Sequence, residues 1–131
     1  MLLYIDTTLN DKIKIALFSK KNNKYFLLSS KNIATKRQQS EKLLPAIISL
    51  LKKNNLDFKD LKMITVSNEG GSFTSLRIGV VTANALAYAL DVKVRAAYLK
   101  NKEIIFKENG FTKINNHEIV EAIYNKEASI G

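Results

Sequence analysis

Asp6, Thr7 and Thr8 form the first group of side chains that could take part in chemistry, since they directly follow the apolar run Leu2 to Ile5. A carboxylate at the end of a buried strand could hold a metal ion with its nucleotide. The accompanying phosphate-binding turn normally needs glycine after the acid, so that backbone N–H groups can approach phosphate oxygens. Thr7 and Thr8 occupy those places, and no glycine precedes Gly70. A locally hydrogen-bonded turn is therefore the favoured interpretation over nucleotide hydrolysis.

A second group lies at the glycine-rich stretch Gly70-Gly71-Ser72-Phe73-Thr74. Gly71 can adopt a positive φ, and Ser72 or Thr74 can cap a following helix, whose N-terminus is a candidate anion site. Arg77 would then lie in the first turn, where a cation opposes the helix dipole. We expect Asp6, Glu69 or a bound anion to compensate it, and an intramolecular pair is favoured.

Other kinds of catalytic site find little support. Ser72, His117 and Asp6 could be imagined as a hydrolase triad, but the G-x-S-x-G nucleophile elbow is absent. The chain has no cysteine and one histidine, which excludes thiolate chemistry and multi-histidine metal sites. We expect no metal and no cofactor.

Strand-like and helical patterns follow one another in an informative order. Three β-rich runs, Leu2–Ile5, Lys12–Ser19 and Tyr25–Ser29, are separated by polar turns and predict an antiparallel meander. Apolar residues at helical spacing then predict a helix capped by Ser40 and ended by Lys52 to Asn55, in which Pro45 forces a late start or a kink. The remaining predicted elements are a strand at Met63–Val66, a helix at about Ser75–Leu90 and a strand at Val92–Ala97.

A meander followed by β-α-β crossovers is typical of the ribonuclease-H-like half of an actin-like (ASKHA) fold. We predict an α/β domain over residues 1–97 with a five-stranded mixed sheet and helices on its faces. Residues 98–131 form a short extension on the same domain, with a strand at Glu103–Lys107 and a helix at Glu118–Tyr124 that Asn115 caps. This helix, extending to about residue 126, is expected to cover the other face of the sheet, so that deleting 116–131 would cause insolubility or unfolding.

The second helix has almost no polar face, which indicates burial on more than one side. Its alanines would let another backbone approach closely, and the first helix also has a broad apolar stripe. Either the two helices bury each other, or they present a patch larger than a monomer tolerates, and we favour contact with a second protein molecule. The predicted partner-binding residues are Leu43, Leu44, Ile47, Ile48, Leu51, Val81, Ala85, Tyr88 and Ala89.

Size and charge limit the classes of protein that need to be considered. The 131 residues suffice for one compact domain, and the net charge of +9 suits RNA or an acidic protein surface as partner. The lysines are spread rather than clustered, which disfavours direct contact with nucleic acid. The N-terminus does not read as a signal peptide, and the apolar run at 78–90 falls short of a membrane span, so a cytoplasmic location is expected.

The sequence resembles the TsaB (YeaZ) family, the accessory proteins of bacterial threonylcarbamoyladenosine synthesis on tRNA, over about residues 1–97. Leu2-Leu3-Tyr4-Ile5-Asp6-Thr7 is similar to the family's first strand. Gln39-Ser40-Glu41-Lys42-Leu43-Leu44-Pro45 resembles its His-Ser-Glu-x-Leu-x-Pro stretch, with Gln39 where histidine is usual. Ser72 to Gly79 resembles its Gly-Pro-Gly-Ser-Phe-Thr-Gly-Leu-Arg-Ile-Gly block.

The resemblance implies a non-catalytic subunit of actin-like fold that has lost its own ATPase. It implies that the two helices pair with the matching helices of a TsaD-like subunit, that a TsaE-like ATPase joins the assembly, and that homodimers form through related surfaces. The motif residues Asp6, Thr7, Gly70, Gly71, Ser72, Phe73, Thr74 and Arg77 would then be the remains of a nucleotide site. Contact with tRNA is expected to be indirect.

This chain departs from the family pattern in two ways. Glu69, Gly70 and Ser75 stand where the family has Gly, Pro and Gly, and the charge of Glu69 disfavours a bound phosphate. Only 34 residues follow Ala97, too few for the family's second lobe, so the chain is either a minimal single-lobe form or a shortened one. The alternatives to an accessory subunit are a small actin-like ATPase or phosphotransferase and a direct tRNA-binding module.

Overall fold

The computed structural model describes residues 1–36, 38–114 and 117–124. Its helices and strands follow one another as β1 (Leu2–Asp6), β2 (Lys12–Lys21), β3 (Lys24–Ala34), α1 (Gln39–Lys53), the 3-10 helix η1 (Phe58–Asp60), β4 (Met63–Val66), α2 (Phe73–Leu90), β5 (Lys93–Lys100), β6 (Glu103–Phe106), β7 (Phe111–Ile114) and β8 (His117–Val120).

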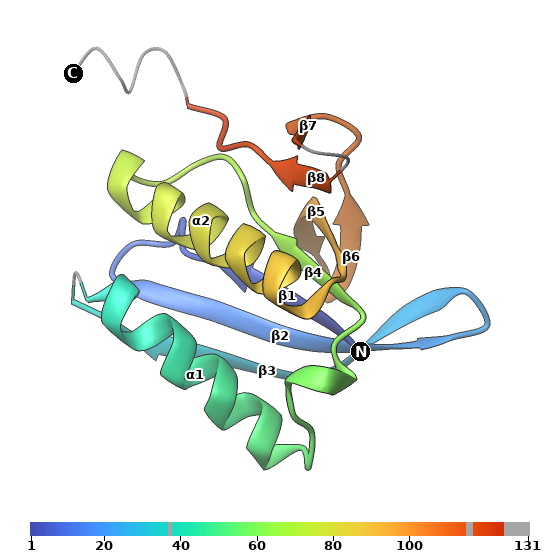
Figure 1. Ribbon diagram of the computed structural model, residues 1–131. Helices are drawn as coiled ribbons and strands as arrows, with labels where there is room; N and C mark the ends of the chain where they lie inside the picture. The colour runs from blue at the N-terminus through green and yellow to red at the C-terminus, as the bar shows by residue number, and fades with distance from the viewer. Residues whose placement is uncertain (37, 115–116, 125–131) are drawn as a thin grey trace.

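The main sheet has the strand order β3-β2-β1-β4-β5-β6 (Figure 1). The strands β1, β2 and β3 pair antiparallel, with Asp6 opposite Lys14, while β1, β4 and β5 run parallel. This arrangement confirms the predicted ribonuclease-H-like order of a meander followed by two crossovers. The predicted number of five strands is wrong, because β6 adds a sixth. Asn101 and Lys102 both have positive φ, the geometry of a tight hairpin turn, and they return the chain along β5.

Both helices cover the same face of the sheet (Figure 1). The apolar stripe of α1 faces inward, with Leu43, Ile47 and Leu51 almost fully buried. In α2 the buried positions include Leu76, Val80 and Ala83, which recur at helical spacing and pack on the parallel strands. A single apolar core between two helices and the sheet therefore holds the domain together.

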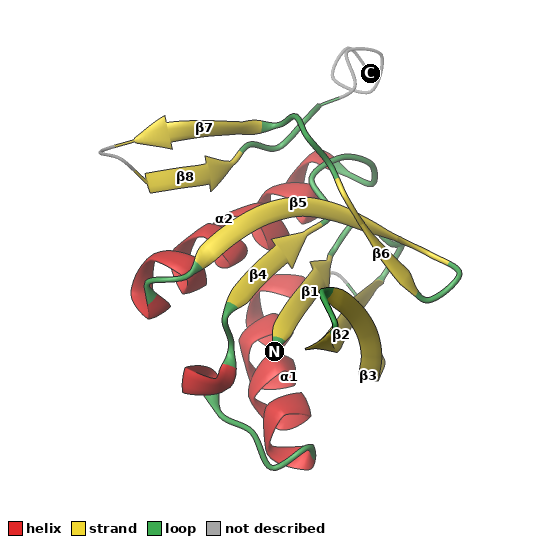
Figure 2. Ribbon diagram, turned by 90° about the vertical axis from the view of Figure 1, so that its right-hand side faces the viewer, coloured by secondary structure: helices red, strands yellow, loops and turns green. Residues whose placement is uncertain are grey.

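The other face of the sheet is covered by the sheet itself, whose edges curl toward each other (Figure 2). Leu2, Tyr4 and Phe18 are buried there, and the rings of Tyr25 in β3 and Phe106 in the opposite edge strand β6 meet edge-on, with their centroids 5.7 Å apart. The prediction that a C-terminal helix covers this face is wrong. Curling lets six strands enclose a small second core, so no further layer is needed.

The helix predicted at Glu118–Tyr124 is also wrong, because His117–Val120 forms the strand β8. It pairs antiparallel with β7 in a hairpin that lies beside α2 and β5 (Figure 1). Asn84 of α2 explains the difference: its side-chain amide donates to the Val120 carbonyl at 2.8 Å and accepts from the Val120 N–H at 2.9 Å. These bonds replace a strand partner. The proposed cap Asn115 and the helix end at 125–126 lie outside the described residues.

The first helix begins earlier than predicted. It starts at Gln39, so Ser40 lies in its first turn, and Gln38 at the cap position makes no side-chain cap bond. Pro45 lies inside the helix, so a late start is excluded. The predicted end at Lys52 and Lys53 is confirmed, with Asn54 as the C-cap. The helix therefore carries its motif residues on a regular first turn.

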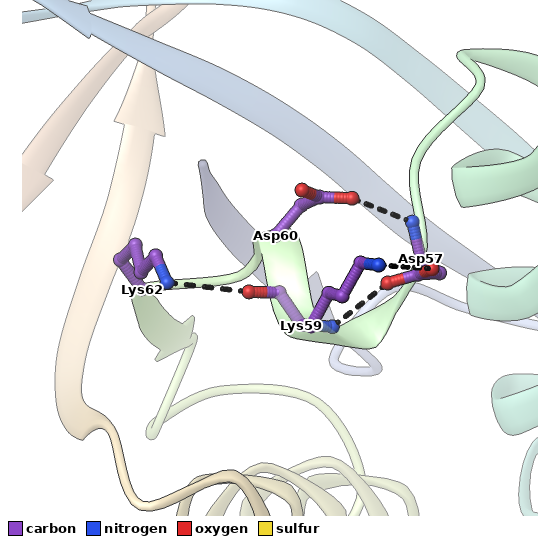
Figure 3. Close-up of polar contacts among 4 residues, drawn as sticks. All are labelled: Asp57, Lys59, Asp60 and Lys62. Carbon is purple, nitrogen blue, oxygen red and sulfur yellow. Dashed lines mark hydrogen bonds and ion pairs between the residues drawn. The ribbon is translucent and has the colours of Figure 1, made fainter.

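A short capped turn leads from α1 back into the sheet (Figure 3). In η1 the Asp57 backbone N–H donates to the Asp60 carboxylate at 2.9 Å, and the Lys59 N–H donates to the Asp57 carboxylate at 3.1 Å. The reciprocal bonds form a capping box. Because the chain's N-terminal amine also donates to the Asp60 carbonyl at 3.1 Å, this turn fixes where β1 and β4 begin.

By length and composition alone, the 18 residues of α2 could cross a membrane, contrary to the expectation from the sequence. A core helix of a soluble protein passes the same test, and one third of the apolar stretch is buried on the sheet. We therefore attribute the high hydropathy of α2 to the apolar side chains that pack on the sheet and to those on its exposed side.

Candidate functional site

Asp6, at the end of β1, is occupied by bonds to its own neighbours. Its Oδ1 accepts from the Thr8 backbone N–H at 2.8 Å and from the Thr8 hydroxyl at 2.5 Å. Its Oδ2 accepts a longer bond from the Tyr4 hydroxyl at 3.4 Å. Burial, reinforced by the nearby Asp6 charge, raises the pKa of Tyr4 well above its ordinary value. The carboxylate therefore closes a local turn, as the sequence suggested.

Thr7 anchors the second helix to the first strand. It is fully buried, and its hydroxyl donates to the Ser75 carbonyl in α2 at 2.5 Å. Gly79, one turn further along α2, allows this close approach, because a Cβ there would collide with the Thr7 hydroxyl. Thr7 is therefore committed to packing rather than to a ligand.

Gly70 and Gly71 both have positive φ, at 98° and 71°. A Cβ at Gly71 would lie only 2.7 Å from the Thr8 Cα, so this turn presses directly on the chain after β1. Ser72 follows as the N-cap of α2, and its hydroxyl accepts from the Ser75 N–H at 3.1 Å, which confirms the predicted cap. The helix begins at Phe73, two residues before the predicted start.

A groove of about 620 Å³ lies between the β1–β2 turn and the first turns of both helices. Among the described residues its lining includes hydroxyls, amides and Asp11, but no lysine, arginine or histidine. Gln39, only 8% exposed, also lies there. A polyphosphate would meet one carboxylate and no cation in this groove, which disfavours nucleotide binding. The residues that line this groove are Thr8, Leu9, Asn10, Asp11, Gln39, Ser40, Gly71, Ser72, Thr74, Ser75 and Ile78.

The predicted ion pair of Arg77 with Asp6 or Glu69 is wrong. Glu69 instead pairs with Lys107, whose ammonium lies 2.5 Å from the Glu69 carboxylate and also donates to the Asn68 side-chain oxygen at 2.9 Å. Among the described residues Arg77 forms no ion pair. Because α2 begins at Phe73, Arg77 opens its second turn and is exposed.

The C-terminal segment is fastened to the turn that precedes α2, a feature that the sequence did not reveal. The side-chain amide of Asn68 donates to the Glu121 carbonyl at 2.9 Å, and the backbone carbonyl of Asn68 accepts from the Ile123 N–H at 2.6 Å. Tyr124 stacks on Phe73 with ring centroids 4.5 Å apart. The partners of Asn68 and Lys107 are far away in sequence, so no local pattern signals them; only the polar types at buried positions could have hinted at them.

One surface of α2 remains largely exposed among the described residues, with Tyr124 stacked on Phe73 and the His117 ring 5.6 Å from that of Tyr88. Its side chains recur at steps of three or four, so they form one continuous face. Tyr88 is 75% exposed and Val81 57%, high values for large apolar side chains. We define the exposed face of α2 as Phe73, Arg77, Val81, Ala85, Tyr88 and Ala89.

The predicted contribution of α1 to partner binding needs correction. Leu43, Ile47 and Leu51 are buried against the sheet, so they cannot contact another molecule. Leu44 is exposed and Ile48 half-buried, so both stay predictions as contact residues. The sequence showed that α1 has a broad stripe but not which edge of it the sheet would cover.

Comparisons with known proteins agree with this architecture. A family model described as "TsaD: tRNA N6-adenosine threonylcarbamoyltransferase" matches residues 29–96, just over half of the chain. The chain is 27% identical over 130 residues to the tRNA threonylcarbamoyladenosine biosynthesis protein TsaB of Buchnera aphidicola from Acyrthosiphon pisum. This match covers 99% of the chain and 55% of the relative. It is 39% identical over 61 residues to the protein of the same name in Bacillus subtilis, covering 47% and 27%.

Among solved structures, YeaZ from Pseudomonas aeruginosa superposes with a TM-score of 0.62 at 19% sequence identity, covering 92% of this chain and 67% of that one. The mixed curled sheet with two helices on one face thus has the fold of YeaZ, an actin-like half-lobe. The chain belongs to the family that the TsaD model describes, and the curated relatives that it matches are TsaB proteins. It spans about half the length of the first of its curated relatives.

Proposed function

We propose that this chain is an accessory subunit in the synthesis of threonylcarbamoyladenosine on tRNA, and that it binds a TsaD-like subunit through the exposed face of α2. The single observation that carries this proposal is that face, apolar except for Arg77 and largely exposed among the described residues. The names of the relatives, tRNA threonylcarbamoyladenosine biosynthesis protein TsaB, support the pathway. The match to the TsaD family model supports a related subunit as the partner.

In this proposal the subunit is not itself catalytic. The residues that would hold a nucleotide are engaged in packing, because Asp6 closes its own turn and Thr7 binds the backbone of α2. The groove beside them offers no cation among the described residues. The transfer reaction would belong to the TsaD-like subunit in the cytoplasm, with a TsaE-like ATPase in the same assembly and tRNA bound by the partners.

Replacing Ala85 by glutamate tests this proposal. Ala85 lies exposed in the middle of the face, so a glutamate there leaves the core intact but brings an unpaired charge into the interface. Titration calorimetry with the TsaD-like subunit from the same organism is expected to show a loss of affinity of about 100-fold or more. The circular dichroism spectrum and the unfolding midpoint should stay close to those of the wild type.

The matched control is Ala34→Glu, the same change at an exposed residue of β3 outside this face. It should bind like the wild type. Equal affinities for Ala85→Glu and Ala34→Glu would contradict the proposed surface, and the absence of any wild-type binding would contradict the proposed function.

A further inference from the structure

Arg77 is the one charged residue among the 18 residues of α2. It lies exposed in a row with Phe73 and Val81, four residues away on either side, both more than half exposed. The Phe73 ring is held in place by Tyr124, which stacks on it. A guanidinium thus lies between apolar groups on a surface that the described residues leave largely exposed.

The two carboxylates that the sequence suggested as partners of Arg77 have other partners. Glu69 is paired with Lys107, whose side chain is only 14% exposed. Asp6 accepts its bonds from Thr8 and Tyr4. Each of these acids serves a structural bond, so neither is free to turn toward α2 when a partner binds.

Docking on this face would remove water from the Arg77 guanidinium. A desolvated cation without a counter-charge costs several kcal/mol, whereas a carboxylate that accepts two parallel N–H bonds offsets this cost. Since the chain carries a net charge of +9, an acidic partner surface also gains from long-range attraction. Among the described residues no carboxylate pairs with Arg77, so a carboxylate on the molecule that covers the face would offset this cost.

We infer that the partner surface that binds α2 is apolar around a single aspartate or glutamate, whose carboxylate receives the Arg77 guanidinium. This inference rests on the proposed function, because it assumes that the exposed face of α2 is the docking surface. Arg77 would be an anchor of the interface, with Phe73, Tyr124 and Val81 excluding water around the ion pair.

Calorimetric titration of the TsaD-like subunit from the same organism into Arg77→Gln, Arg77→Lys and the wild type tests this inference. Arg77→Gln should lower the affinity about 30-fold or more, because it leaves the partner's carboxylate desolvated and unpaired. Arg77→Lys should fall between, since an ammonium keeps the charge but loses the paired N–H geometry. The affinity of Arg77→Gln should also depend less on salt than that of the wild type.

Two controls separate this inference from the docking surface itself. Lys52→Gln removes an exposed cation from the last turn of α1 and should change the affinity less than about threefold. Ala85→Glu should abolish binding. If Ala85→Glu fails to bind while Arg77→Gln binds like the wild type, the ion pair is refuted and the docking surface stands. If the wild type does not bind, both are refuted.

Discussion

Gly71→Ala is expected to destabilise the domain by about 3 kcal/mol or more, a large part of the stability of a protein of this size. The added Cβ would lie 2.7 Å from the Thr8 Cα, a backbone atom of the turn that the bonds between Thr8 and Asp6 hold in place. The φ of 71° adds the cost of placing an L-residue in the left-handed region, about 1 kcal/mol. Urea unfolding followed by circular dichroism measures the loss.

Gly70→Ala is the matched control for this variant. Its φ is also positive, at 98°, but the nearest atom to the new Cβ would be 3.9 Å away. It should therefore lose only the backbone contribution of about 1–2 kcal/mol. If both variants lose the same stability, the turn does not press on the chain after β1, and the close contact between the two loops is wrong.

Val120→Asp should cost about 3–5 kcal/mol, because it places an unpaired carboxylate in the core between α2 and the sheet. Val120 is 2% exposed, and its backbone is held on both sides by Asn84. This variant tests whether the C-terminal hairpin packs as an integral part of the domain. Thermal unfolding monitored by calorimetry gives the answer.

Ile114→Asp makes a comparable change on the same hairpin at a side chain that is exposed. It should alter the stability by less than about 1 kcal/mol. Equal stabilities of the two variants would show that β7 and β8 are not packed on the domain. The predicted division at Ala97 into a lobe and an extension stays a prediction, although Val120 lies in the same core as the first lobe.

The sequence was most informative where a pattern is long or is set by neighbouring residues. The helix α2, except for its first two residues, and the strand Met63–Val66 were predicted because apolar periodicity and the flanking turns agree. The segment at 118–124 was misread because seven residues can fit either period. Its conformation is decided by Asn84, more than thirty residues earlier, and such a contact leaves no mark on local sequence.

The candidate site was predictable in its residues but only partly in its geometry. The absence of glycine after Asp6 correctly indicated a turn held by local hydrogen bonds, those between Asp6 and Thr8. The ion-pair partner of Glu69 could not be predicted, because only the pairing of β5 with β6 brings Lys107 close to it. Because Glu69 is paired with Lys107, Arg77 has no ion-pair partner among the described residues. The departure at Glu69 thus bears on the surface of α2 rather than on a phosphate.

The central claim is that this chain supports threonylcarbamoyladenosine formation without performing the transfer itself. Reconstitution with tRNA, an activated threonylcarbamoyl donor, ATP, the TsaD-like subunit and the TsaE-like ATPase from the same organism tests this claim most directly, with the modified nucleoside quantified by mass spectrometry. We predict formation only when the wild-type chain is present together with the TsaD-like subunit, and none with Ala85→Glu. Equal formation without the chain, or formation by the chain in the absence of the TsaD-like subunit, would contradict the account.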